Sequence, residues 1–213
     1  MHTTNRFRLL ACLLPLLVNT PLTLSAQSEK ADAPAPRFAV AEPTLSPDGR
    51  EIAFVSGGDI WTVPTTGGEA RLLVAHSDNE SRPLYSPDGT YLAFGSTRSG
   101  NGDIYLLTLE TGELRRLTYD DGAETLTGWA PDSKIVYFQS TSRDVAGMND
   151  IYRVPITGGT PMAVTADRYA SEFYGTPSPT GRRWLFRRGV SLPHSGGAKA
   201  AATSTKPNSG PAS

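Results

Sequence analysis

The sequence predicts an all-β fold made of repeated four-stranded antiparallel units, and three recurring markers support this. A turn motif returns at proline spacings of 40, 44 and 48 residues, as Ser46-Pro47-Asp48-Gly49, Ser86-Pro87-Asp88-Gly89, Ala130-Pro131-Asp132-Ser133 and Ser178-Pro179-Thr180-Gly181. A strand motif follows it, as Asp59-Ile60-Trp61, Asp103-Ile104-Tyr105 and Asp150-Ile151-Tyr152. A glycine turn comes third, at Gly67-Gly68, Thr111-Gly112 and Gly158-Gly159. Ordered markers at such a period are typical of repeat architectures.

Each repeat reads as a meander of four strands. In the turn motif, proline presets φ for the first corner, aspartate can hydrogen-bond its own backbone, and glycine accepts a positive φ. The motif therefore predicts a turn that joins a short first strand, such as 83–85, to a second strand. Runs rich in β-branched and aromatic residues predict the later strands. The second strands are expected at 51–55, 91–94 and 135–138, the third at 60–63, 104–107 and 151–154, and the fourth at 71–74, 114–117 and 162–164.

The apolar pattern decides which all-β architecture these repeats build. Adjacent residues are apolar in Ile52-Ala53-Phe54-Val55 and in Ile135-Val136-Tyr137-Phe138, so both faces of these strands must be covered. Four-stranded sheets stacked around an axis provide this cover at about 40 to 45 residues per unit. The sequence therefore predicts a partial β-propeller of about three and a half blades. A β-sandwich is the alternative, but it gives no reason for the markers to return in order.

The repeat markers also predict the organisation of the chain. The propeller is expected at 42–190, with blades at 42–74, 82–118 and 125–165 and a partial blade at 171–187. Alanines and prolines predict a linker at 27–41. Residues 191–213 contain hardly any large apolar side chain and are expected to be a disordered tail. Propellers close with about four to eight blades, so we expect self-association or a missing C-terminal part.

The first 26 residues have the layout of a signal peptide. Arg6 and Arg8 precede an apolar stretch of about ten residues, too short for the roughly 20-residue helix that spans a bilayer, and Ser25-Ala26 suits cleavage before Gln27. No membrane span is expected in the mature chain, which we expect to be periplasmic or secreted. Cys12 is the only cysteine; its surroundings loosely resemble a lipoprotein acylation box, although the apolar stretch continues beyond it.

Charge excludes one class of partner. The formal charge is −1, and removal of residues 1–26 takes away two arginines and no acid, which shifts it to −3. Basic and acidic residues are interspersed, whereas nucleic-acid binding usually needs a clustered basic surface. We therefore expect no nucleic-acid partner.

We expect no catalytic residues, no cofactor-binding residues and no metal ligands. The mature chain has two histidines: His76 falls in the loop between blades one and two, and His194 falls in the predicted tail. No Gly-x-Ser-x-Gly motif occurs, and two distant histidines form no metal-binding pattern. The glycines of Ser99–Asp103 precede no helix, so they do not predict a phosphate cradle. The repeated aspartates are expected to be structural because they recur in successive blades: Asp48, Asp88 and Asp132 in turns, and Asp59, Asp103 and Asp150 at strand starts.

One loop stands out as a candidate binding element. The segment Thr141 to Asn149 is longer than its equivalents and holds Arg143 beside Asp144. Long loops on a rigid scaffold often carry binding function. We expect this loop to help contact a peptide or protein.

The repeats resemble a known family. The turn motif followed by an apolar strand and Asp-Ile-Trp/Tyr is similar to the TolB-type, WD-like propeller repeat of secreted bacterial proteins, from about Glu42 to Phe186. The stretches 57–64, 141–152 and 171–174 resemble more closely the N-terminal propeller of tricorn-type serine peptidases. In that family propellers precede a PDZ module and a catalytic domain, and the implied role is to gate or deliver peptides.

This resemblance implies the function we expect. The chain ends in the fourth blade, so no catalytic serine, PDZ module or peptidase core can be carried over to it. We expect an exported, non-catalytic module that binds a protein or peptide, as the N-terminal propeller fragment of a tricorn-like periplasmic peptidase. The alternative is a TolB-like envelope scaffold that docks a peptidoglycan-associated partner, and a further alternative is an autonomous enzyme.

Overall fold

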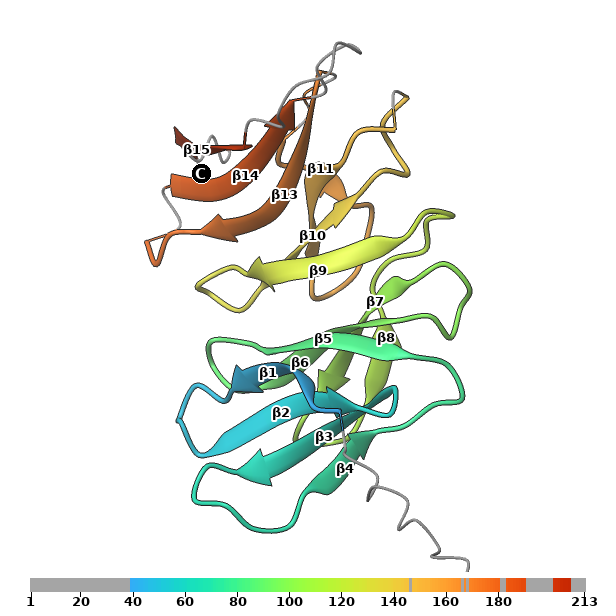
Figure 1. Cartoon of the computed structure of the whole chain (residues 1–213), viewed down its shortest axis with the longest axis vertical. Helices are drawn as coiled ribbons and strands as arrows, with labels where there is room; N and C mark the ends of the chain where they lie inside the picture. The colour runs from blue at the N-terminus through green and yellow to red at the C-terminus, as the bar shows by residue number, and fades with distance from the viewer. Residues whose placement is uncertain are drawn as a thin grey trace, which may run out of the picture. The chain divides into compact units, whose positions relative to one another are not determined.

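The strands of this chain pair into separate antiparallel sheets. The computed structural model describes residues 39–145, 147–165, 167, 169–180, 183–190 and 201–207. Among these residues, three sheets contain four consecutive strands each, and a further sheet contains three (Figure 1). Neighbouring strands in every sheet are also neighbours in sequence. This is the predicted partial β-propeller, and the sheets are its blades, numbered one to four in chain order.

The complete blades place their strands at equivalent positions of the repeat. Blade one contains β1 (Ala41–Leu45), β2 (Glu51–Ser56), β3 (Asp59–Pro64) and β4 (Arg71–Val74). Blade two contains β5 (Glu80–Tyr85), β6 (Tyr91–Ser96), β7 (Asp103–Thr108) and β8 (Leu114–Arg116). Blade three contains β9 (Glu124–Trp129), β10 (Ile135–Ser140), β11 (Asp150–Pro155) and β12 (Met162–Ala163). Every predicted strand of these blades overlaps its observed counterpart.

Blade four contains β13 (Ala170–Pro177), β14 (Arg183–Val190) and β15 (Ala201–Pro207). The last strand differs from the expectation of a disordered tail from residue 191 onward, which was wrong for 201–207. Composition shows whether a segment can bury apolar surface, but β15 pairs with β14 through backbone groups, which do not depend on apolar side chains. The rest of the predicted tail, the predicted signal peptide and most of the linker lie outside the described residues.

The turn motif forms the hydrogen-bonded turn that its residues predict. In blade two, Gly89 N donates to Ser86 O at 2.9 Å, and Gly89 has a φ of 74°. Ser86 Oγ donates to Asp88 Oδ1 at 2.6 Å and accepts from Tyr91 N at 2.9 Å. Thr90 N donates to Asp88 Oδ1 at 3.0 Å. The same bonds recur around Ser46 and Asp48, so the motif joins the first two strands of blades one and two in the same way.

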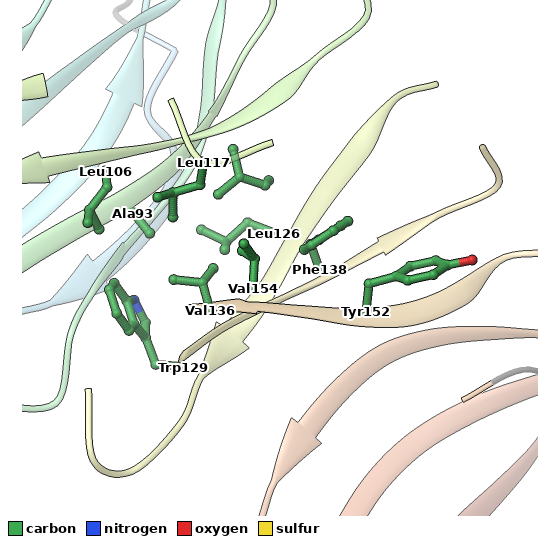
Figure 2. Close-up of a cluster of buried hydrophobic side chains, with 10 residues drawn as sticks. Ala93, Leu106, Leu117, Leu126, Trp129, Val136, Phe138, Tyr152 and Val154 are labelled. Atoms are coloured by element: carbon green, nitrogen blue, oxygen red, sulfur yellow. The ribbon is translucent and has the colours of Figure 1, made fainter. Parts of the chain in front are cut away.

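The cores lie between consecutive blades. Side chains alternate across each strand, so every blade sends one row of apolar residues to each neighbour. Figure 2 shows the core between blades two and three, where Ala93, Leu106 and Leu117 meet Leu126, Trp129, Val136 and Val154. Equivalent cores join blade one to blade two and blade three to blade four. Each blade is thus stabilised by the adjacent blade, as in other repeat proteins.

The first strand of each blade lies nearest to the other blades. β1 contacts β5, β5 contacts β9, and β9 contacts β13. Hydrogen bonds also run between these strands and the turns beside them: Trp129 Nε1 donates to Leu84 O at 3.0 Å, and Asp88 N donates to Ser133 Oγ at 3.1 Å. We refer to β1, β5, β9 and β13 as the inner strands.

Candidate functional site

Each inner strand carries a β-bulge at one position of the repeat. The pairing register shifts within β1, β5, β9 and β13. Three of the bulges contain a non-glycine residue in the left-handed region, with φ of 52° at Glu42, 49° at Arg82 and 56° at Tyr174. All three lie five residues before the proline of the turn motif. Bulges and strained backbone of this kind are concentrated at functional sites, so this position is the first place to look for one.

Arg82, the bulge residue of blade two, contacts each of the three other blades. The backbone N of Arg82 donates to Glu42 Oε2 at 2.5 Å, and its guanidinium Nε donates to Leu126 O at 2.7 Å. The guanidinium carbon lies 5.9 Å from the centre of the Tyr174 ring. Leu126 occupies the equivalent position of blade three. We call Glu42, Arg82, Leu126 and Tyr174 the inner cluster.

The tyrosine of the inner cluster is held by its backbone and presents its ring to solvent. Tyr174 N donates to Gln139 Oε1 at 3.0 Å, while 54% of the residue surface is exposed. Glu42, the glutamate of the cluster, is exposed as well. The inner cluster therefore brings a carboxylate, a guanidinium and an aromatic ring together on a rigid frame. Such groups bind peptides by hydrogen bonding, by charge and by stacking.

The histidines that the sequence analysis considered as catalytic or metal-binding candidates do not belong to the inner cluster. His76 lies in the loop after β4, where its backbone N donates to Asp59 and its Nδ1 accepts from Asp78 N at 3.1 Å. His194 lies outside the described residues. Within the described part of the chain, no group of three or more His, Cys, Asp or Glu side chains could hold a metal ion. No described helix is long and apolar enough to cross a membrane.

The repeated aspartates hold the backbone. Hydrogen bonds from Ser46 and from Arg50 N keep the pKa of Asp48 below its usual range. Asp132 accepts from Lys134 N at 3.1 Å in the third turn. At the strand starts, Asp59 accepts from His76 N and Asp150 accepts from Asp167 N, so each connects the third strand to the segment that leaves the fourth. Asp103 is held by Arg116 at 2.8 Å. These contacts are those of structural residues.

The long loop of blade three is fixed by its arginine. Arg143 Nε and Nη2 donate to the two carboxylate oxygens of Asp120 at 2.6 and 2.9 Å. This pair raises the pKa of Arg143 and ties the loop to the segment that follows β8. Val145 at its tip is fully exposed. The binding role of the loop stays a prediction, and the geometry assigns its arginine to holding the loop in place.

Sequence reasoning did not predict the inner cluster. Its members differ in chemistry, so no motif shared among the repeats indicates them. A signal was nevertheless present, because all four residues stand five positions before the proline of the turn motif. Aligning the repeats on that proline would have placed them at one level of the inner strands.

The stacked four-stranded repeats, with their inner strands and shared turn motif, define a TolB-like β-propeller. Residues 40–195 match the model of the tricorn protease N-terminal beta propeller domain, and the chain belongs to this family. The matched residues include every strand from β1 to β14.

Comparison with individual proteins supports this assignment. Tricorn protease homolog 1 from Streptomyces coelicolor is 30% identical over 114 residues, which are 53% of this chain and 11% of that protein. An uncharacterized protein from Agrobacterium fabrum is 29% identical over 180 residues, 80% of this chain and 58% of that protein. The crystal structure of TolB from Acinetobacter baumannii shares the fold, with a TM-score of 0.64 at 24% identity over 80% of this chain and 41% of that one. The chain thus spans less than two thirds of each of these proteins.

Proposed function

We propose that this chain is an exported, non-catalytic propeller module that binds a protein or peptide, acting in the periplasm or outside the cell as the N-terminal propeller part of a tricorn-like peptidase. The inner cluster carries this proposal. Its carboxylate, guanidinium and aromatic ring come from three different blades and meet on bulged inner strands. Family membership supports the same role, since the matched family is a propeller domain of a protease.

The inner cluster suits an extended peptide better than a small apolar ligand. A peptide offers amide groups to the carboxylate and the guanidinium, and side chains to the exposed ring. The contact from Arg82 Nε to Leu126 O fixes the guanidinium plane, so little side-chain entropy is lost when a ligand binds. Because Tyr174 and Arg82 also lie within cation–π distance, the ring and the cation form one surface.

Retention of peptides by the purified chain tests the proposal. The probe is a mixture of random unstructured peptides about eight residues long, with mass spectrometry as the readout. We expect the wild type to retain a subset of them and Tyr174→Ala to weaken binding of that subset by about 30-fold, as for an aromatic hot spot. Tyr174→Phe should retain most of the binding because the ring remains.

A matched control and two contrary results complete the test. Tyr169→Ala removes another exposed tyrosine outside the cluster and should leave binding unchanged. Equal retention by the wild type and by Tyr174→Ala would exclude the inner cluster as the site. Cleavage of any peptide by the wild type would refute a non-catalytic role. Capture of a peptidoglycan-associated protein from envelope extract, with no peptide retained, would favour the TolB-like scaffold role instead.

A further inference from the structure

Glu124 is a buried acid with an unused carboxyl oxygen. It is the first residue of β9, which contacts β6 and β7 of blade two, and it is 5% exposed. Thr118 Oγ1 donates to its Oε2 at 2.7 Å, while its Oε1 is buried and has no hydrogen-bond partner among the described residues. A buried carboxylate is costly unless it is paired and hydrogen-bonded, so this position favours the neutral acid.

Blade two contains the same glutamate with a cation beside it. Glu80 and Glu124 both stand seven positions before the proline of the turn motif. The Oε1 of Glu80 accepts from Arg98 Nη2 at 2.6 Å and from Ser96 Oγ at 3.3 Å. Blade three has Ser142 where blade two has Arg98. The repeat thus supplies an arginine to one buried glutamate and withholds it from the other.

The charged groups that act on Glu124 come from three other segments. They are Asp103 at the start of β7, Arg116 at the end of β8, and Asp120 between β8 and β9. Burial raises the pKa of Glu124 to about 7, the two aspartates raise it as well, and Arg116 lowers it. Arg116 already has partners, since it donates to Asp103 at 2.8 Å and to Thr118 O at 2.7 Å.

Arg143, at the start of the long loop, is the arginine that can change partner. It donates to both carboxylate oxygens of Asp120, and its side chain is 32% exposed. The bonds to Asp120 raise the pKa of Arg143 most, and the charge of Glu124 raises it further. Tyr152, whose ring lies 6.0 Å from the guanidinium carbon, stays neutral because burial raises its pKa to about 12. Arg143 therefore lies within electrostatic reach of a second acid.

The segments that carry this ion pair are packed together. Ser140 Oγ donates to Ala123 O at 3.1 Å and lies 2.9 Å from Ser142 Oγ. A Cβ on Gly122 would lie 2.5 Å from the Cβ of Ser142, so the segment between β8 and β9 directly contacts the start of the long loop. A change of partner by the arginine is therefore transmitted to both segments.

We propose that Arg143 changes partner with pH: it binds Asp120 while Glu124 carries a proton, and it moves to Glu124 once that proton is lost. An unpaired buried charge costs more free energy than the loss of a partly exposed ion pair, and Asp120, at 25% exposure, can be hydrated instead. The start of the long loop moves with the arginine. This inference concerns a surface other than the inner cluster and does not depend on peptide binding.

Double-mutant cycles in urea unfolding test the change of partner. Asp120→Asn combined with Arg143→Gln measures the first pair, and Glu124→Gln combined with Arg143→Gln measures the second. At about pH 5.5, the first pair should show a coupling of at least about threefold in the unfolding equilibrium constant, and the second pair none. At about pH 8.5, the first coupling should disappear and the second should reach at least about threefold. An unchanged coupling with Asp120, or none with Glu124 at the higher pH, would overturn the proposal.

A further variant gives blade three the charge arrangement of blade two. Ser142→Arg changes an exposed residue, so the chain should still fold. The added guanidinium should neutralise Glu124, and the coupling between the loop arginine and Asp120 should then persist at both pH values. Asp121→Asn, which removes a neighbouring exposed acid, is the matched control and should leave the change of partner intact. Loss of the Asp120 coupling at the higher pH despite Ser142→Arg would also overturn the proposal.

Discussion

At the scale of single residues, Glu124 shows how burial between two blades changes the pKa of a side chain. It begins β9 and is buried between blades two and three, where Thr118 Oγ1 donates to its Oε2 at 2.7 Å. Burial raises the pKa of Glu124 to about 7, and the nearby carboxylates of Asp103 and Asp120 act in the same direction. Glutamates also stand at the same repeat position in blades two and four, as Glu80 and Glu172, and both are buried.

The raised pKa predicts a pH-dependent loss of stability. As pH rises from 4.5 to about 7, the unfolded chain loses the proton of Glu124 while the folded chain keeps it. The free energy of unfolding therefore falls through this window. Glu124→Gln cannot ionise and still accepts from Thr118, so the wild type should lose about 1 to 2 kcal/mol more than this variant between those pH values.

Urea unfolding of both proteins at a series of pH values measures this difference. Other groups, such as Asp150, whose pKa burial raises to about 6, titrate in both proteins and cancel in the comparison. Glu113→Gln, which changes an exposed glutamate, should follow the wild type. Parallel curves for the wild type and Glu124→Gln would show that Glu124 ionises normally in the folded chain.

At the scale of elements, the turn motif explains both the strand boundaries and their repetition. Ser86 closes the turn from its hydroxyl, and the backbone bonds from Ser86 N to Tyr91 O and from Gly89 N to Ser86 O complete it. Blade three has Ala130 instead and keeps the backbone bonds, with Ser133 at a φ of 60° in place of glycine. The backbone therefore sets the turn, and the serine adds stability.

Removing the serine hydroxyl of the turn motif should lower the free energy of unfolding more where the serine is buried than where it is exposed. Ser86 is fully buried, and Ser86→Ala leaves Asp88 Oδ1 and Tyr91 N with one partner fewer, so the free energy of unfolding should fall by about 1 to 2 kcal/mol. Ser46→Ala removes the same bonds from the more exposed turn of blade one, where water can replace them, and should cost less. Urea unfolding compares the two, and equal losses would contradict the role given to burial.

At the scale of the whole molecule, stability depends on the junctions between blades. Phe94 is fully buried, packs with Tyr105 at 6.0 Å between ring centres, and lies in the core shared by blades one and two. Phe94→Ala should lower the free energy of unfolding by about 3 to 5 kcal/mol, the usual cost of such a cavity. Because each blade is stabilised by its neighbour, the effect should extend across the junction.

Native-state hydrogen exchange shows where that stability is lost. Amides of β2, β3, β6 and β7 should exchange faster in Phe94→Ala, while those of β14, two junctions away, should change less. Leu114→Ala, which shortens a partly exposed side chain in β8, should leave the pattern intact. Loss of protection confined to blade two would contradict a shared core.

Most of the fold could be predicted from sequence because its determinants are local and periodic. Turn residues such as Pro47 and Gly49 act through their own backbone, and the paired apolar residues of 135–138 indicate a strand that is covered on both faces. The repetition of Asp59, Asp103 and Asp150 favoured a structural role over a catalytic one. The position of β15 was not predictable in this way, because it rests on backbone pairing with β14.

The sequence by itself determined the blades: their order, their turns and the two apolar faces of every sheet, because each follows from residues close together in the chain. Only the tertiary structure decided what those blades bring together. Glu42, Arg82 and Tyr174 are separated by a repeat or more in sequence, and they meet because the inner strands pack side by side. The pKa of Glu124 depends likewise on which blade lies alongside, a relation between distant residues that no local pattern records.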